Sequence, residues 1–233
     1  MWGLVFPGQG SQHVGMGKFL YDNFVVAKDV FTEASEAINL DLAKLCFEGP
    51  ESALQLTANT QPALLTVSIA TFRVLKNLVH LQTKLCAGHS VGEYAALVAA
   101  KAISFSDGVR AVRLRGQLMQ EAVPVGEGGM LAVIGLDEEQ IQVLCQYVTQ
   151  NSGLGPLEPA NFNAPGQIVI SGSARAIEWT RTNFKSEVLP GEPKKVRFIP
   201  LPVSAPFHCS MMKPAEKLMG EHLHTILFGK PEI

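Results

Sequence analysis

The sequence predicts an α/β fold in which a small domain interrupts a larger one. Three observations support this prediction. Strand and helix signals alternate through the first half of the chain, and residues 128–202 follow a strand-helix-strand-strand-helix-strand order. In addition, a short apolar strand runs through a glycine-flanked serine into an alanine-rich helix at residues 85–100.

The first half of the chain is expected to form a sheet covered by helices. Leu4-Val5-Phe6 predicts a short buried strand that runs into a glycine-rich loop at residues 7–12. Ser104 to Asp107 resembles a capping box, which predicts that a helix begins there. The other expected elements are a strand at 85–87 and helices at 28–38, 61–78 and 92–100.

The second half is expected to form a ferredoxin-like unit, because its order of elements is that of this motif. The expected strands are 130–134, 158–162, 167–171 and 196–201, and the expected helices are 137–149 and 175–184. We therefore expect a small domain at residues 125–202, inserted into a larger domain formed by residues 1–124 and 203–233.

Composition favours a globular protein of the cytoplasm. Of the 233 residues, 47% are hydrophobic and 17% charged, so the chain can bury a full core. No basic segment precedes Pro7-Gly8, so no secretion signal is expected. The apolar stretch at 63–72 is far shorter than the roughly 20 residues of a membrane helix. We expect no membrane association and a monomer.

Charge and cysteine spacing argue against nucleic-acid and metal binding. The net charge of −2 supplies no basic surface, and the local group Lys194-Lys195-Val196-Arg197 fits a solvated strand start. Cysteines at 46, 86, 145 and 209 lack the spacing of metal ligands or of a disulfide framework. The loop from Gly8 lacks the third glycine of the dinucleotide fingerprint, so a nicotinamide or flavin cofactor is not expected.

Ser90 is the candidate nucleophile. Gly88-His89-Ser90-Val91-Gly92 has the form G-x-S-x-G and lies between a predicted strand and a predicted helix. The glycines permit a sharp turn that exposes the serine, and the helix N-terminus offers N–H groups and a positive dipole. A developing oxyanion could be held by the backbone N–H of Val91 and by one from the loop around Gln9.

A serine needs a base, and His208 is the best placed of the six histidines. It lies in a proline-rich loop directly before a predicted helix, where side chains are often held rigidly. His89 adjoins the nucleophile on the wrong side, and His222 and His224 lie two apart on an expected helix. His13 and His80 lack a framing motif. A capping or surface role for His208, or Cys209 as the nucleophile, are the alternatives.

Arg115 is the candidate cationic residue for binding the substrate. The predicted helix after residue 104 places it on one face with Val112, Leu118 and Met119. A guanidinium among apolar side chains either binds an anionic group or extends its charged end to solvent. Spacing alone leaves both interpretations open.

Six motifs occur in one order along nearly the whole chain, and together they are far more specific than any one of them. They resemble the malonyl-CoA:acyl carrier protein transacylase family. The motifs are residues 6–12 (FPGQGSQ), 60–63 (TQPA), 88–93 (GHSVGE), Arg115-Gly116 with Met119-Gln120, 161–167 (NFNAPGQ) and Phe207-His208.

The resemblance implies an α/β-hydrolase-like core with a mostly parallel sheet and an inserted ferredoxin-like domain. It makes Ser90 the acylated nucleophile, His208 the base, and Gln9 and Val91 the oxyanion donors. Arg115 becomes a carboxylate clamp, since a guanidinium can hold a carboxylate through two parallel hydrogen bonds. Pocket-lining positions match Gln61, Met119 and Asn163, and Phe207 matches the bulky residue of malonyl-selective members.

The implied reaction moves malonyl from malonyl-CoA to acyl carrier protein in two stages, for fatty acid synthesis, without a metal or bound cofactor. A serine thioesterase or hydrolase of the same core fold is one alternative, and an acyltransferase serving polyketide synthesis is another. A non-catalytic carrier-protein docking module is a third. The family's pattern continues beyond the position of Ile233, including a carbonyl that orients the histidine, and this sequence has no counterpart of that segment.

Overall fold

The computed structural model describes every residue except 192 and 194, so Lys194 of the basic group lies outside the described residues. The chain divides into two compact units, one formed by Met1–Gln117 with Met219–Ile233 and the other by Leu118–Leu218. The domain limits expected at 124/125 and 202/203 fall within the second unit, and the expected domain division stays a prediction.

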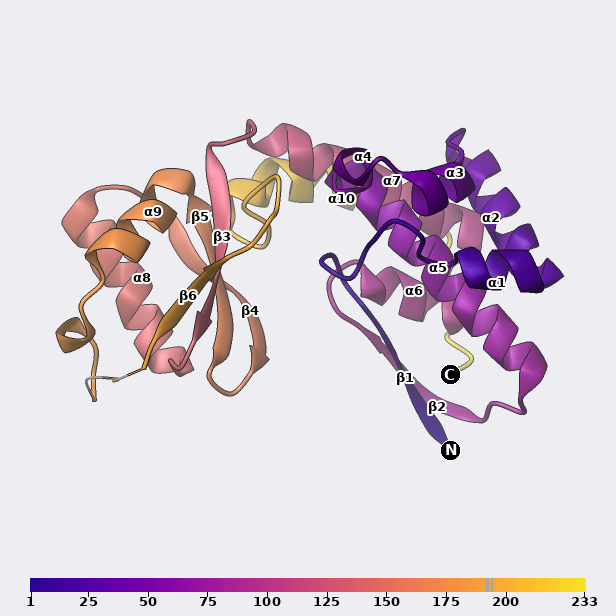
Figure 1. Ribbon diagram of the computed structural model, residues 1–233, viewed down its shortest axis with the longest axis horizontal. Helices are drawn as coiled ribbons and strands as arrows, with labels where there is room; N and C mark the ends of the chain where they lie inside the picture. Colours follow the sequence, from indigo (N-terminus) through magenta and orange to yellow (C-terminus); the bar gives the residue numbers. More distant parts are fainter. Residues whose placement is uncertain (192, 194) are drawn as a thin grey trace. The chain divides into compact units, whose positions relative to one another are not determined.

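The first unit is built around a parallel pair of strands. Strands β1 and β2 lie side by side in parallel, with Phe6 opposite Gly88 (Figure 1). Because parallel strands need a long crossover connection, helices fill the sequence between them. The elements are β1 (Trp2–Phe6), α1 (Lys18–Asn23), α2 (Val25–Ile38), α3 (Leu42–Glu48), α4 (Glu51–Leu54), α5 (Thr57–Leu78), β2 (Thr83–Gly88), α6 (Gly92–Ala99), the first part of α7 (Phe105–Ala122) and the end of α10 (Lys213–Leu223).

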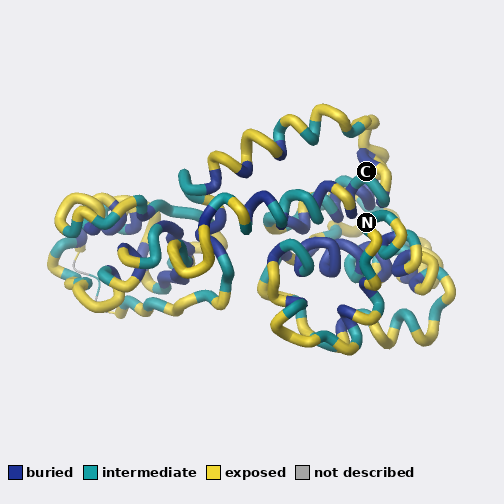
Figure 2. Tube along the Cα trace, turned by 90° about the horizontal axis from the view of Figure 1, so that it is seen from above, coloured by how far each residue is buried: buried dark blue, intermediate teal, exposed yellow. Residues whose placement is uncertain are grey.

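Helix α5 is the centre of the first unit's core. It packs against α2 and α6, and Leu65 and Ile69 on α5 are buried with Phe31 of α2. Buried positions interleave with exposed ones along the helices, as the helical period requires (Figure 2). The expected helices around α2, α5, α6 and α7 are confirmed. Helices α1, α3 and α4 were not predicted, because segments of four to seven residues show too little periodicity.

The second unit has the expected order of elements, β3-α8-β4-β5-α9-β6. Its four strands form an antiparallel sheet in the order β4-β5-β3-β6, and both helices lie on one face of it (Figure 1). Leu131, Ile141 and Ile170 are fully buried between sheet and helices. The elements are β3 (Gly128–Ile134), α8 (Glu138–Ser152), β4 (Leu157–Ala164), β5 (Gln167–Ser173), α9 (Ala174–Asn183), a 3₁₀ turn (Ser186–Val188), β6 (Arg197–Pro200), and a 3₁₀ turn (Ser210–Met212) that leads into α10.

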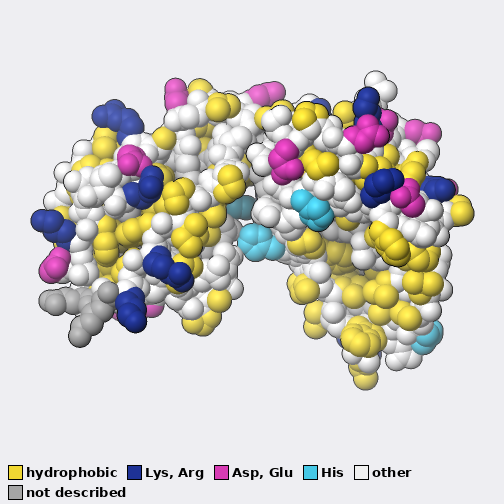
Figure 3. Space-filling model, in the orientation of Figure 1, with side chains coloured by type: hydrophobic (Ala, Val, Ile, Leu, Met, Phe, Trp, Pro, Cys, Tyr) yellow, Lys and Arg dark blue, Asp and Glu magenta, His cyan; other side chains and the backbone are white. Residues whose placement is uncertain are grey.

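Apolar side chains lie exposed around the two-stranded sheet of the first unit. Trp2, Val5 and Leu85 are each more than half exposed, and apolar surface gathers over this region (Figure 3). None of the described helices combines the length and the apolar character that crossing a bilayer requires.

A glycine lets α7 approach the start of α5 closely. A Cβ built at Gly116 would lie 2.6 Å from both the Thr57 carbonyl oxygen and the Ala58 Cα. Pro62 lies within α5 and has no N–H to give to the Ala58 carbonyl four residues earlier. Arg113 of α7 donates to that carbonyl instead, at 2.8 Å. At this crossing the two backbones therefore lie in close contact, and the Arg113 side chain binds α7 to the backbone of α5.

We predict that Gly116→Ala lowers the free energy of unfolding by about 1–3 kcal/mol, because the added methyl must push two backbones apart. Gly220→Ala in α10 is the matched control, since a Cβ there meets nothing within 4 Å. The control should stabilise the protein by about 0.5–1 kcal/mol through helix propensity. Urea unfolding checks both, and equal stability of the two variants would contradict the close packing.

Candidate active site

Ser90 lies on a strained turn between β2 and α6. Its φ of 51° is in the left-handed region, which non-glycine residues rarely adopt except where surrounding structure imposes it. A Cβ at Gly88 would lie 1.9 Å from the carbonyl carbon of Gly92, and one at Gly92 would lie 2.3 Å from the Phe6 carbonyl oxygen. The strand-turn-helix context expected for G-x-S-x-G is therefore confirmed, and its glycines are required sterically.

The glycine-rich loop after β1 runs beside this turn. The His89 N–H donates to the Phe6 carbonyl at 3.0 Å, which extends the pairing one residue past the end of β2. Gly8 passes so close that a Cβ there would lie 2.5 Å from Nδ1 of His89. Parallel strands end at the same edge of a sheet, so the loop carrying Gln9 and the turn carrying Ser90 emerge together.

Arg115 reaches Ser90 from α7. Its Nη2 donates to the Ser90 Oγ at 3.2 Å, and its Nη1 donates to the Gln61 Oε1 at 2.7 Å. Burial lowers the pKa of Arg115, while Tyr94 and Glu93 oppose that shift. An arginine stays protonated even so, and here its charge is met by two neutral oxygen atoms. A guanidinium in this setting is suited to bind an anionic group beside the serine.

A chain of hydrogen bonds continues from Gln61. The Gln61 Nε2 donates to the Thr57 Oγ1 at 2.9 Å, and that hydroxyl donates to the Gln9 Oε1 at 2.9 Å. The structure thus connects the predicted residues Gln9, Gln61, Ser90 and Arg115 within one unit. Thr57 was missed because the helix was expected to begin at Gln61, whereas α5 begins at Thr57 and so places the two residues, four apart, on one face.

His208 lies in the second unit, as do Phe207, Asn163 and Met119. His208 is exposed, and its φ of 60° shows a sharp backbone turn, while the preceding Phe207 is buried. Met119 is buried one helical turn after Arg115 on α7. Asn163 is exposed at a register shift in β4, next to the turn that joins β4 to β5.

Contacts with three residues, Glu158, Gln120 and Gly128, hold the loop that carries His208. Glu158 of β4 accepts from the Ser210 N–H at 2.7 Å and from the Ser210 Oγ at 2.6 Å. The Gln120 Nε2 donates to the Ser204 carbonyl at 3.3 Å. Pro206 packs directly against Gly128, because a Cβ built on that glycine would lie 2.3 Å from the proline ring. Nothing in the sequence singled out Glu158, because it sits alone on a strand.

Cys209 has the chemistry of a structural thiol. Burial raises its pKa, whereas a nucleophilic cysteine needs a lowered one. Its Sγ contacts the Pro206 carbonyl at 3.2 Å.

His224, one of the other histidines, lies just beyond the end of α10 at Leu223. The expectation that it shares a helix with His222 was therefore wrong.

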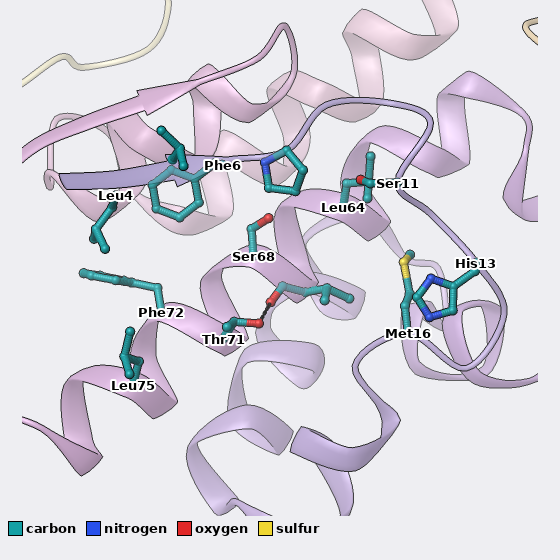
Figure 4. Close-up of a pocket in the computed structure, with 13 residues that line it drawn as sticks. Leu4, Phe6, Ser11, His13, Met16, Leu64, Ser68, Thr71, Phe72 and Leu75 are labelled. Atoms are coloured by element: carbon teal, nitrogen blue, oxygen red, sulfur yellow. Dashed lines mark hydrogen bonds between the residues drawn. The ribbon is translucent and has the colours of Figure 1, made fainter. Parts of the chain in front are cut away.

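An apolar cavity of about 400 Å³ lies between β1, the loop after it and α5. Figure 4 shows Phe6, Leu64 and Phe72 among its lining side chains. The Ser11 hydroxyl, which also lines it, is bound to the Gly8 carbonyl at 2.9 Å. The cavity contains neither Ser90 nor Arg115, so it is not the candidate active site.

We predict that Glu158→Ala releases the loop around His208 and lowers the free energy of unfolding by about 1–3 kcal/mol, because two Ser210 donors lose their acceptor. Hydrogen exchange of the Ser210 amide should accelerate in the variant. Glu187→Ala, on an exposed 3₁₀ turn, is the control and should change stability by less than about 0.5 kcal/mol. Unchanged exchange at Ser210 would show that Glu158 does not hold the loop.

Comparison with known proteins identifies the family. The acyl transferase domain model matches residues 4–233. The malonyl CoA-acyl carrier protein transacylase of Salmonella typhimurium is 44% identical over 230 residues, which cover 99% of this chain and 72% of that protein. The Bacillus subtilis protein of the same name is 49% identical, with 94% and 67% covered. A solved complex of a type II PKS acyl-carrier protein with its malonyl-transacylase matches with a TM-score of 0.89 and 44% identity, covering 99% of this chain and 72% of that one. This chain therefore belongs to the malonyl CoA-acyl carrier protein transacylase family of acyl transferases.

Proposed function

We propose that the chain transfers a malonyl group from malonyl-CoA to the pantetheine thiol of an acyl carrier protein, through a malonyl ester on Ser90. The observation that carries the proposal is the guanidinium of Arg115 at 3.2 Å from the Ser90 hydroxyl. Malonyl differs from acetyl by a terminal carboxylate, and a cation this close to the nucleophile suits a short acyl group that ends in one. The names of the relatives agree with this chemistry.

In the first stage Ser90 Oγ attacks the thioester carbonyl while His208 takes the hydroxyl proton. The C–S bond then breaks, and coenzyme A leaves with the proton that His208 held. In the second stage His208 takes the proton of the pantetheine thiol and the sulfur attacks the ester carbonyl. The bond between that carbon and Ser90 Oγ then breaks, and His208 returns the proton to Oγ. The backbone N–H groups of Val91 and Gln9 would stabilise the oxyanion in both stages.

Acyl selectivity is proposed to come from Arg115, Gln61 and Phe207. Arg115 and Gln61 would bind the malonyl carboxylate, and the ring of Phe207 would crowd a branch at carbon 2. Asn163 and Met119 are proposed to line the same pocket. Burial of Phe207 supports a fixed wall, because a buried ring cannot swing aside without cost.

We further propose that residues 125–202, within the second unit, form a ferredoxin-like domain and that residues 1–124 and 203–233 form an α/β-hydrolase-like core. The β4-β5-β3-β6 order and the β-α-β-β-α-β sequence support the former. The parallel β1–β2 pair and the serine turn support the latter. No metal or bound cofactor enters the proposed reaction. The free thiols of Cys46, Cys86, Cys145 and Cys209 support a reducing compartment such as the cytoplasm.

We predict that brief exposure to malonyl-CoA adds one malonyl group to Ser90 and that Ser90→Ala abolishes the adduct. Mass spectrometry of the intact protein and of its peptides measures both. Transfer is then followed by adding carrier protein. Rapid release of malonic acid with no transfer would favour a thioesterase, and an unmodified Ser90 would favour a docking module.

We predict that Arg115→Ala raises the activation free energy of malonyl transfer by on the order of 3 kcal/mol, because the buried malonyl carboxylate loses its partner. This corresponds to a fall of about 150-fold in kcat/KM. Acetyl transfer should fall much less. Arg110→Ala on the exposed side of α7 is the matched control and should leave both rates within about twofold. Equal losses for the two acyl groups in Arg115→Ala would contradict the clamp.

The pathway served is a separate proposal. We favour fatty acid synthesis, the role implied by the family's motifs. The solved relative bound to a type II PKS acyl-carrier protein keeps polyketide synthesis as the second candidate. Transfer rates to the two kinds of carrier protein, measured with the same malonyl-enzyme, distinguish these roles.

A further inference from the structure

We infer that Thr57 is a positioning residue that sets the orientation of the Gln61 amide and thereby of the Arg115 guanidinium. This inference rests on the proposed function of the Ser90 site. Thr57 is the first residue of α5 and is fully buried. Its hydroxyl lies between two glutamine side chains that come from different parts of the chain.

The direction of each hydrogen bond follows from the donors available. A threonine hydroxyl has one proton, and the Gln9 Oε1 at 2.9 Å can only accept it. The Thr57 oxygen must then accept from the Gln61 Nε2, also at 2.9 Å. This leaves the Gln61 Oε1 directed at Arg115, where it accepts from Nη1 at 2.7 Å.

The opposite orientation of the Gln61 amide would be unfavourable at both ends. Its NH₂ group would then face the guanidinium, donor against donor, and its oxygen would face a hydroxyl whose proton is already given to Gln9. Gln61 is 1% exposed, so water cannot relieve such a conflict. The hydroxyl of Thr57 therefore selects one of two amide orientations, and only this one supports the cation.

Thr57 is held in place on its backbone side as well. The close approach of α7 at Gly116 leaves 2.6 Å between the Thr57 carbonyl oxygen and a Cβ built on that glycine. Helix α7, which carries Arg115, thus packs against the backbone of Thr57, and the side chain of Thr57 orients Gln61, the partner of Arg115. At its other end the hydroxyl holds the side chain of Gln9, the proposed oxyanion residue.

The test compares Thr57→Val with Thr57→Ser. Valine keeps the shape of threonine but removes the hydroxyl, whereas serine keeps the hydroxyl. We expect Thr57→Val to lower kcat/KM for malonyl transfer about 10- to 100-fold and to lower acetyl transfer distinctly less, with Thr57→Ser close to the unmodified protein. Thr66→Val is the matched control, because its buried hydroxyl on the same helix donates only to the Pro62 carbonyl at 2.7 Å.

A second readout does not depend on catalysis. The side-chain amide signal of Gln61 in a ¹⁵N spectrum, assigned by its loss in Gln61→Glu, should shift and lose exchange protection in Thr57→Val but not in Thr66→Val. If valine prevents folding, Thr57→Ala serves in its place, since it removes the same hydroxyl and leaves no methyl group in the position of the hydroxyl, against the two polar amides.

Two results would overturn the inference. One is a Thr57→Val variant whose ratio of malonyl to acetyl kcat/KM equals that of the unmodified protein. The other is a Gln61 amide signal that does not change in Thr57→Val. If the unmodified protein forms no malonyl ester on Ser90, the proposed function fails. The amide signal then still decides whether Thr57 orients Gln61, so the two failures are distinguishable.

Discussion

Close backbone contact at glycine positions is the constraint on which the candidate site depends. Gly88 allows the serine turn to close on Gly92, and Gly92 allows the turn to pack against the end of β1. Gly116 allows α7 to approach α5 closely. A side chain at any of these positions would overlap backbone atoms, which cannot move aside as a flexible side chain can. Because these close contacts form, Arg115 comes within hydrogen-bond distance of both Ser90 and Gln61.

The polar groups of the site are ordered by hydrogen bonds to one another. A buried amide and a buried hydroxyl must each find a partner, and the chain Arg115–Gln61–Thr57–Gln9 supplies one at every step. Burial also strengthens each of these bonds, since the interior screens charges less than water does. The result is a guanidinium held ready beside the serine before any substrate binds, which reduces the ordering that binding requires.

In the second unit, close packing and hydrogen bonds likewise hold the loop of His208. A proline packed over Gly128 and a carboxylate that holds both donors of Ser210 leave the loop little freedom. The positive φ of His208 resembles that of Ser90, and strained backbone of this kind persists only where surrounding contacts impose it. The proposed base and the proposed nucleophile are thus each presented by a tight, supported turn.

The sequence by itself determined most of the longer elements and indicated the candidate site residues. Periodicity and glycine placement predicted α5, α6, the serine turn and the whole β3-α8-β4-β5-α9-β6 order, because these depend on local preferences and on short-range spacing. The motifs identified Ser90 and Arg115 as residues of interest, but spacing left the arginine's role open. Only the tertiary structure decided that Arg115 contacts Ser90, that Thr57 joins Gln61 to Gln9, and that Glu158 holds the loop of His208. These contacts join residues far apart in the chain or depend on such a contact, and no local pattern records which distant donor and acceptor the packing of helices and strands will bring together.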